Sequence, residues 1–389
     1  MALSSIANEA MNHSTLSTAT EAGATASPTT SPSSLARPGG PFLVKPEDPV
    51  LVTGAAGFIG SRVVWSLCER GFRNLVCFGR PSGKLASLAE IAKDYPDAQM
   101  QFITGNLLSP RDCEAASKDA KLIIHLAAGA GEKSFPDAFM NSVVTTRNLL
   151  DASLACGQLR RFVLVSSFSV YTNRGKPHRQ LLDESCPLEE HGDLRGDAYC
   201  FAKYKQEQLL AEYGRSFGIP YVVVRPGTVY GPQKQAIVGR VGIDTFGFFL
   251  HMGGSNTIPF TYVDNCADAI VLAGLVRGVE GEIFNVVDDD LPSSRQFLRW
   301  YKTNVRGFKS VYVPHVASYA LCYLWEKYSR WSEGQVPPAF NRKRWHAYWK
   351  KTSYSNEKLK TRLGWAPRVS TAEGLQRFFA SCREDGRNA

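Results

Sequence analysis

The chain has 389 residues, of which 44% are hydrophobic, 11% aromatic and 21% charged, so it can bury a sizeable globular core. Its formal net charge of +9 fits an anionic ligand, although a basic surface without functional meaning is equally open. The absence of a long Lys/Arg run or of zinc-finger spacing argues against a nucleic-acid partner, and no apolar stretch is long enough for stable membrane insertion.

Residues 1–45 are rich in Ser, Thr, Ala and Pro, and we expect them to form a disordered leader, with order beginning near Pro49. The leader lacks the apolar core of a secretory signal, and its single Arg37 argues against organelle import. The nine cysteines are dispersed without a C-x-x-C pair, which predicts reduced thiols and a cytoplasmic location.

From Pro49 onward, short apolar runs alternate with helical patterns. The expected strands lie at residues 49–53, 75–78, 101–104, 122–126, 162–165 and 221–224. Near-continuous apolar strands separated by helices predict an α/β fold with a Rossmann-like, doubly wound parallel sheet. We therefore expect a nucleotide-binding domain at residues 46–235, and a smaller, mainly substrate-binding part with C-terminal helices at residues 236–389.

A Gly-rich turn lies directly between the first strand and the first helix. Glycines there permit a tight turn, close approach of a pyrophosphate and close helix–strand packing. The following helix N-terminus supplies unpaired N–H groups and a partial positive charge. The sequence therefore predicts a dinucleotide site formed by Thr53, Gly54, Gly57, Phe58, Ile59 and Gly60.

The end of the second strand bears on cofactor choice. It reads Phe78-Gly79-Arg80, with Ser82 and Lys84 close by and no acidic residue until Glu90. An acid would bind the ribose 2′-hydroxyl of NAD, whereas Arg80 can pair with a 2′-phosphate. We therefore expect a preference for NADP(H); if Arg80 instead stacks on the adenine, NAD(H) remains possible.

Tyr199 and Lys203 are four residues apart, so on a helix they share one face. A neighbouring ammonium and a positively charged nicotinamide both favour phenolate, which lowers the pKa of a tyrosine that serves as acid and base. Ser167 follows the fifth strand, where its hydroxyl can bind the reacting oxygen. Ser166 is expected to be tied to the backbone.

An aromatic-rich segment from Pro314 to Trp331 has helical spacing. We expect it to pack on the core, the alternative being a helix that lies on a membrane surface. The histidines lack ligand spacing, so no metal site is predicted, and His251 is expected to be structural.

Taken together, these motifs resemble the extended short-chain dehydrogenase/reductase family, also called the NAD-dependent epimerase/dehydratase family. The resemblance covers roughly Pro49 to Phe379. Besides the Gly-rich turn, the segments that carry it are His125–Ala128, Asn141, Val165–Ser167, Tyr199 with Lys203, Arg225–Pro232, Tyr262–Asn265, Phe284–Val286 and Lys358–Pro367.

The resemblance implies roles for individual residues. Tyr199 would be the acid/base, Ser167 would hold the substrate oxygen and Lys203 would anchor the ribose. Asn141 would support the nicotinamide end. Further cofactor contacts are expected from Asn106, Leu107, Leu126, Ala127, Ala128 and Pro226. The chain departs from the family at Asn106 and Asn265, which stand where Asp is usual. Many relatives pair through the Tyr/Lys helix, so a homodimer is expected.

The residues after the fifth strand narrow the reaction. Dehydratases of the family carry acids there, and decarboxylating relatives a Glu, whereas this chain has Ser167-Phe168-Ser169. The main expectation is an oxidoreductase that moves hydride between cofactor and a secondary alcohol or ketone. The aromatic C-terminal part resembles the 3β-hydroxysteroid and sterol dehydrogenase branch, which implies a bulky, sterol-like small-molecule substrate.

Two other functions stay open. One is a nucleotide-sugar epimerase with tightly bound NAD, in which Arg240, Arg342 and Lys343 hold the diphosphate, unless they form only a solvated face. The other is a non-catalytic, cofactor-binding scaffold, which is disfavoured because both Tyr199 and Lys203 are present.

Overall fold

The computed structural model describes residues 41–387, apart from residues 82–85, 130–133, 176–179, 235–236, 246, 334 and 337–339. These described residues belong to one compact unit. Residues 1–40 of the expected leader, and Ser82 and Lys84, lie outside them. Packing begins earlier than the expected Pro49, because the Leu43 N–H donates to the Leu275 carbonyl (2.8 Å) and Val44 is buried in the core.

A seven-stranded parallel sheet forms the centre of the molecule. All six predicted strands are confirmed, as β1 (Val50–Thr53), β2 (Asn74–Gly79), β3 (Gln99–Thr104), β4 (Leu122–His125), β5 (Arg161–Val165) and β7 (Tyr221–Pro226). The strand order is β12-β7-β5-β4-β1-β2-β3. It reverses between β1 and β4, and ligands bind at such a switch point, beyond the carboxyl ends of the strands.

The seventh strand, β12 (Ile283–Val286), pairs with β7. It comes from beyond residue 235, so the sheet draws on both of the expected parts of the chain. The proposed division at residue 235 therefore stays a prediction about which residues meet the substrate.

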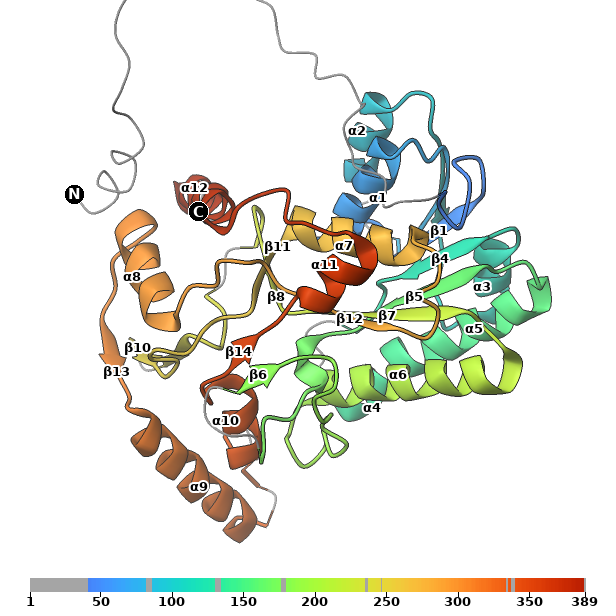
Figure 1. The fold of residues 1–389 in the computed structure, drawn as a ribbon. Helices are drawn as coiled ribbons and strands as arrows, with labels where there is room; N and C mark the ends of the chain where they lie inside the picture. The colour runs from blue at the N-terminus through green and yellow to red at the C-terminus, as the bar shows by residue number, and fades with distance from the viewer. Residues whose placement is uncertain are drawn as a thin grey trace, which may run out of the picture. The chain divides into compact units, whose positions relative to one another are not determined.

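Helices cover both faces of the sheet, as the sequence pattern predicts (Figure 1). On one face lie α1 (Gly60–Glu69) and α7 (Val263–Leu275), whose apolar side chains share a core with Val50 and Val52. On the other lie α3 (Pro110–Ser117), α5 (Thr145–Cys156) and α6 (Ala198–Phe217), which pack around Leu51 and Ile123. Burial of the sheet on both faces explains why its strands are apolar throughout.

The remaining elements are short or peripheral. They are α2 (Ala86–Asp94), α4 (Phe135–Ala138), β6 (Leu181–Leu182), β8 (Thr228–Tyr230), β11 (Phe260–Tyr262), α8 (Ser294–Asn304), β14 (Ser353–Tyr354), α11 (Glu357–Leu363) and α12 (Thr371–Arg387). A second sheet consists of β9 (Gly242–Thr245), β10 (Phe248–His251) and β13 (Ser310–Tyr312).

The aromatic-rich segment is a helix, α9 (His315–Trp331), as predicted. The expectation that it packs on the core holds for one edge only. Its buried residues are Ser318, Cys322 and Ser329, and it meets α10 (Arg342–Tyr348) around a small separate cluster of Met252, Cys322, Trp345 and Trp349. The face of α9 that points away from α10 is exposed, because no further element covers it among the described residues.

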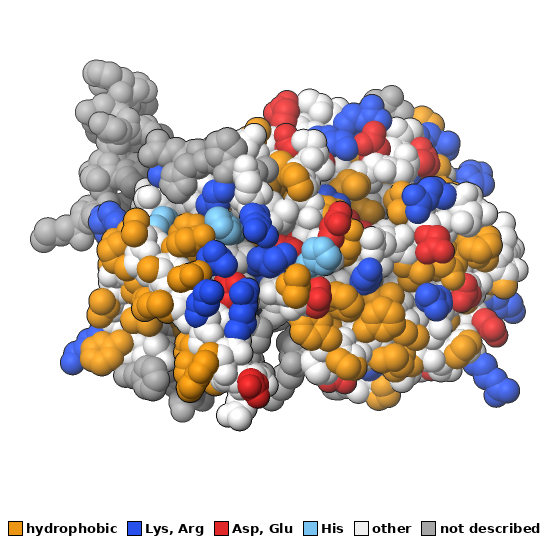
Figure 2. All heavy atoms as spheres, turned by 90° about the horizontal axis from the view of Figure 1, so that it is seen from below, with side chains coloured by type: hydrophobic (Ala, Val, Ile, Leu, Met, Phe, Trp, Pro, Cys, Tyr) orange, Lys and Arg blue, Asp and Glu red, His pale blue; other side chains and the backbone are white. Residues whose placement is uncertain are grey.

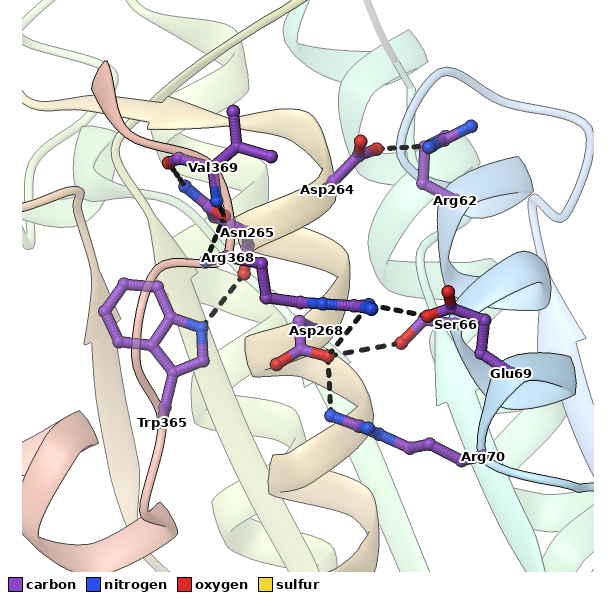
Figure 3. A network of polar contacts seen from close by, with 10 residues as sticks. All are labelled: Arg62, Ser66, Glu69, Arg70, Asp264, Asn265, Asp268, Trp365, Arg368 and Val369. Atoms are coloured by element: carbon purple, nitrogen blue, oxygen red, sulfur yellow. Dashed lines mark hydrogen bonds and ion pairs between the residues drawn. The ribbon is translucent and has the colours of Figure 1, made fainter. Parts of the chain in front are cut away.

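A polar network fastens the C-terminal segment to α1 and α7 (Figure 3). Asp268 on α7 accepts a hydrogen bond from Arg70, directly after α1 (2.5 Å), and lies 3.8 Å from the Arg368 guanidinium. Asn265, where the family usually has Asp, donates to the Val369 carbonyl (2.8 Å) and accepts from the Arg368 N–H (2.9 Å). An ionised carboxylate cannot donate, so the amide suits this structural position.

Candidate active site

The Gly-rich turn joins β1 to α1 with little room for side chains. Gly54 has φ +70°, which favours glycine, and a Cβ there would lie 3.1 Å from the Ala127 backbone nitrogen. A Cβ on Gly60 would lie 2.1 Å from the Gly54 carbonyl oxygen. The turn therefore depends on glycine both for its tight backbone conformation at Gly54 and for the close packing of the helix at Gly60.

The start of α1 is suited to an anion. Its N-cap position, Ile59, offers no side-chain hydrogen bond, and no acid lies in the first turn. Within the described residues, the backbone N–H groups of Phe58 and Ile59 donate to no backbone carbonyl. Gly57, which directly precedes Phe58, is exposed. Free N–H groups at a glycine-lined helix N-terminus match what a dinucleotide pyrophosphate needs.

The predicted adenosine-side residues follow neighbouring strands at the same edge. Arg80 comes directly after β2 and is exposed. Asn106 comes after β3, is exposed, and accepts a hydrogen bond from the Leu108 N–H through its side chain (3.0 Å). Leu107 is buried, and its carbonyl accepts from Asn148 (2.9 Å). The structure thus places all three at the carboxyl edge of the sheet.

The segment after β4 contacts the Gly-rich turn. The Leu126 N–H donates to the Thr53 carbonyl (3.2 Å), and the Ala127 N–H donates to the Thr53 hydroxyl (3.3 Å). Ala128 follows in the same half-buried segment. Pro226 ends β7 and is buried. The first three therefore line the switch point, whereas Pro226 lies two strands away, beyond β5.

The residues predicted to be catalytic lie close together beside β5. Tyr199 and Lys203 lie in the first turns of α6, whose N-cap Asp197 accepts a hydrogen bond from the Cys200 N–H (2.9 Å). The Lys203 ammonium donates to the Val165 carbonyl at the end of β5 (2.8 Å), 6.0 Å from the centre of the Tyr199 ring. The hydroxyl of Ser167 bonds with Tyr199. Tyr199, Lys203 and Ser167 are therefore brought together as predicted.

The pKa of Tyr199 moves opposite to the expected direction in this structure. Burial raises its pKa to about 12, against the lowering effect of the Ser167 hydrogen bond. Burial also lowers the pKa of Lys203 to about 8, while the carboxylate of Glu207 raises it. The protein's own groups therefore favour a protonated Tyr199, which suits a proton donor to a developing alkoxide.

Asn141 lies in a π-helical turn, η2 (Phe139–Val144), between α4 and α5. Its side-chain amide donates to the Asp137 carbonyl (3.0 Å). The same turn is tied to α6, because Gln206 donates to the Ser142 carbonyl (3.2 Å). π-Helical turns are frequent at functional sites. The structure thus fastens the Asn141 turn to the helix of Tyr199, and the role of Asn141 stays a prediction.

A buried chain of polar groups beneath this site has no predicted role. His125 hydrogen-bonds with the hydroxyls of Thr53 (2.7 Å) and Thr146 (3.0 Å), and Gln206 also donates to Thr146 (2.7 Å). Burial lowers the pKa of His125 to about 3, so the ring is neutral. These hydrogen bonds link the Gly-rich turn to α6. In the sequence they are indicated only by polar residues within apolar elements and by the motif segment His125–Ala128.

The expectation for Ser166 is wrong. Its hydroxyl donates to the carboxylate of Glu207 rather than to the backbone. Glu207 also pairs with Arg225 on β7 (2.5 Å), and both are buried. Arg225 donates in turn to the Tyr171 hydroxyl (2.8 Å). A buried charge needs such partners. The sequence of the motif Arg225–Pro232 does not indicate that Arg225 pairs with Glu207.

Three arginines surround the aromatic ring of Tyr348, near Tyr199. Tyr348 of α10 donates to the Asp197 carboxylate (3.2 Å). Arg195 lies 5.4 Å, Arg240 5.2 Å and Arg344 5.8 Å from the ring centre. Arg195 is buried and paired with the Asp197 carboxylate (2.8 Å), so the positive charge that the C-terminal part brings to the start of α6 comes from Arg240 and Arg344.

The other basic residues named for a diphosphate have acidic partners. Arg342 bonds to Glu326 (3.0 Å) and Lys343 to Glu189 (2.8 Å). Arg240 instead donates to the Ala347 carbonyl (3.0 Å). His251 is buried and bonds with Ser294 (3.1 Å), which confirms its structural role.

A family model described as "NAD dependent epimerase/dehydratase family" matches residues 50–286. The chain belongs to this family. It is an NAD-dependent enzyme of the extended short-chain dehydrogenase/reductase type, as the Gly-rich turn and the Tyr/Lys pair indicate. The likeness of its C-terminal part to sterol dehydrogenases stays a prediction, and so do the homodimer and the cytoplasmic location.

Several curated relatives are similar over much of the chain. A trifunctional UDP-glucose 4,6-dehydratase/3,5-epimerase/reductase of Arabidopsis thaliana is 27% identical over 62% of this chain, which matches only 37% of that protein. A putative UDP-glucose 4-epimerase of Methanocaldococcus jannaschii is 25% identical over 87% of this chain and 99% of its own length. A 2-alkyl-3-oxoalkanoate reductase of Stenotrophomonas maltophilia is 26% identical over 85% and 98%.

Solved structures share the fold. The UDP-glucuronic acid 4-epimerase of Bacillus cereus, in complex with UDP-glucuronic acid and NAD, aligns with a TM-score of 0.65 at 23% identity over 86% of this chain and 99% of that one.

Within the described residues, no group of three or more His, Cys, Asp or Glu is placed to hold a metal ion. None of the described helices is long and apolar enough to cross a membrane.

Proposed function

We propose that the chain is a nucleotide-sugar epimerase that removes hydride from a sugar carbinol carbon and returns it to the other face. The observation that carries this proposal is the Arg240 guanidinium beside Tyr348, near the start of the Tyr199 helix, because it bonds to the Ala347 carbonyl and the Tyr354 hydroxyl rather than to a carboxylate. Such charge suits a diphosphate. The UDP-sugar activities in the names of several relatives point the same way.

Each residue has a definite task in this reaction. The bound dinucleotide would supply hydride acceptance and donation. Phe58 and Ile59 would bind its pyrophosphate through their N–H groups. Ser167 would hold the reacting oxygen, and Tyr199 would move the proton at that oxygen. Lys203 would hold the ribose, and Arg240 the substrate diphosphate. Residues 168–169 provide no carboxyl group to expel water, which disfavours dehydration.

For the cofactor we propose a preference for NADP(H), with NAD(H) as the alternative. Arg80 is exposed directly after β2, where a 2′-phosphate would lie, and no acidic side chain follows within the described part of that loop. Dissociation constants for NADPH and NADH, measured on the wild-type protein and on Arg80→Ala, test this preference. Only NADPH binding is expected to weaken, by about tenfold. Equal weakening of both would mean adenine stacking.

The reaction is tested with UDP-glucose and UDP-glucuronic acid, by following the C4 epimers by NMR. Tyr199→Phe is expected to lower turnover by at least ~100-fold while cofactor binding persists. Tyr213→Phe, on the same helix but bonded to Asp151, is the matched control and should keep activity. Turnover that survives in Tyr199→Phe contradicts the assigned proton transfer.

A second candidate is an oxidoreductase that acts on a bulky, lipid-like ketone with exchangeable cofactor. The similarity to an oxoalkanoate reductase over nearly its whole length favours it. Dinucleotide released by denaturing the purified protein separates the two. Stoichiometric bound cofactor supports the epimerase, because hydride must return in place. A protein free of cofactor that reduces 2-alkyl-3-oxoalkanoates with NAD(P)H supports the reductase.

A further inference from the structure

The outer face of α9 exposes a continuous apolar stripe. We define this face by five side chains at helical spacing, Val316, Leu321, Leu324, Tyr328 and Trp331, which are 84%, 57%, 60%, 50% and 76% exposed. Eight of the fifteen exposed large hydrophobic side chains of the described residues lie between Val311 and Trp331. Scattered apolar residues need no explanation, but a contiguous patch indicates an interaction surface.

The surroundings of this face are strongly basic. Residues 309–351 hold eight Lys or Arg and two Glu, so they account for most of the chain's net charge of +9. Arg174, Arg330, Arg342 and Lys343 line a cavity of about 450 Å³ at α9 and α10, where the acidic side chains Asp193 and Glu326, together with Glu189 paired to Lys343, offset part of their charge. Figure 2, which views the side on which α9 lies in Figure 1, shows hydrophobic side chains gathered beside a group of Lys and Arg.

We propose that α9 docks the protein on the surface of an anionic lipid bilayer. An amphipathic helix lies in the interface when an apolar face with Trp and Leu adjoins a polar face with Lys and Arg. Tyr328 and Trp331 stack at the C-terminal end of the stripe, with Lys327 and Arg330 beside them. Aromatic rings with a polar edge suit the headgroup level. The helix would lie on the bilayer and not cross it.

Charge favours a bilayer over a second copy of this chain. A two-fold contact through α9 would bring two equally basic surfaces together, and like charges at short range repel. Anionic headgroups attract the same surface, by about 1 kcal/mol for each Lys or Arg near it. This docking is independent of the proposed epimerase activity.

Vesicle co-sedimentation of the full chain tests the proposal. Vesicles of phosphatidylcholine with phosphatidylglycerol should bind the protein, and vesicles of phosphatidylcholine alone should bind it less. Leu324→Glu is expected to weaken binding to the anionic vesicles by roughly tenfold. Phe217→Glu is the matched control, because Phe217 is equally exposed (59%) at the far end of α6. It should bind like wild type.

Three results overturn the proposal. The wild-type protein remains in the supernatant with anionic vesicles; Leu324→Glu binds as tightly as wild type; or sedimentation velocity shows a dimer that Leu324→Glu dissociates, which assigns the face to a second copy. Circular dichroism melting of both variants checks that each is folded, so a loss of binding is attributable to the outer face.

Discussion

Helices α6 and α9 reverse the usual relation between composition and burial. α6 buries Lys203, Gln206 and Glu207, whereas α9 exposes Leu321 and Leu324. The polar residues of α6 are inside because each has a partner there, such as Arg225 for Glu207. The apolar residues of α9 are outside because no described element covers them. Such departures from the hydrophobic pattern are expected at functional surfaces.

The largest predicted effect breaks the buried side of this comparison. Glu207→Gln removes the charge that pairs with Arg225 and accepts from Ser166, and it leaves a buried guanidinium unpaired. We expect a loss of about 3–5 kcal/mol in the free energy of unfolding, measured by urea denaturation. Glu212→Gln, exposed on the same helix, should change it by less than about 0.5 kcal/mol. A similar small effect in both variants would mean that the pair is not needed for folding.

Two leucines compare the helices directly. Leu210 on α6 is 0% exposed in the core beneath the sheet, and Leu324 on α9 is 60% exposed. Leu210→Ala should destabilise the protein by about 3 kcal/mol because it leaves a cavity. Leu324→Ala should change stability by less than about 0.5 kcal/mol. Thermal or urea unfolding measures both. A large cost for Leu324→Ala would show that α9 is covered in solution.

The sequence predicts α6 and α9 as helices, but it does not distinguish their surroundings. The sheet is predictable because strands buried on both faces are apolar throughout, and the Gly-rich turn because its geometry excludes side chains. Tyr199 and Lys203 are found by spacing. The pairing of Glu207 with Arg225 is not predictable, since nothing local brings α6 and β7 together. The exposure of Leu324 is not predictable either, because the sequence pattern of an apolar helix face is the same whether a protein core or a membrane covers that face.

Acid should destabilise the region beneath α6. Burial lowers the pKa of His125 to about 3, below its usual value of 6.5. A depressed histidine pKa gives stability that is present above pH 6.5 and is lost as the pH falls, because the unfolded chain binds the proton first. From pH 7 to pH 5 we expect His125 to account for about 2 kcal/mol. Urea unfolding at several pH values measures the slope, which should be shallower in His125→Asn; an unchanged slope would contradict the assignment.

The smallest predicted effect lies in the ion pairs of α9. Arg342 and Glu326 join α10 to α9, but the Arg342 side chain is 39% exposed, whereas that of Arg225 is 2% exposed. Water screens the outer pair and solvates either partner alone, so Arg342→Gln should cost less than about 1 kcal/mol. Added salt should reduce this cost further. Urea unfolding at low and high salt measures it. A salt-independent loss of several kcal/mol would place the pair in an environment as dry as that of Glu207, and the contrast between the helices would fail.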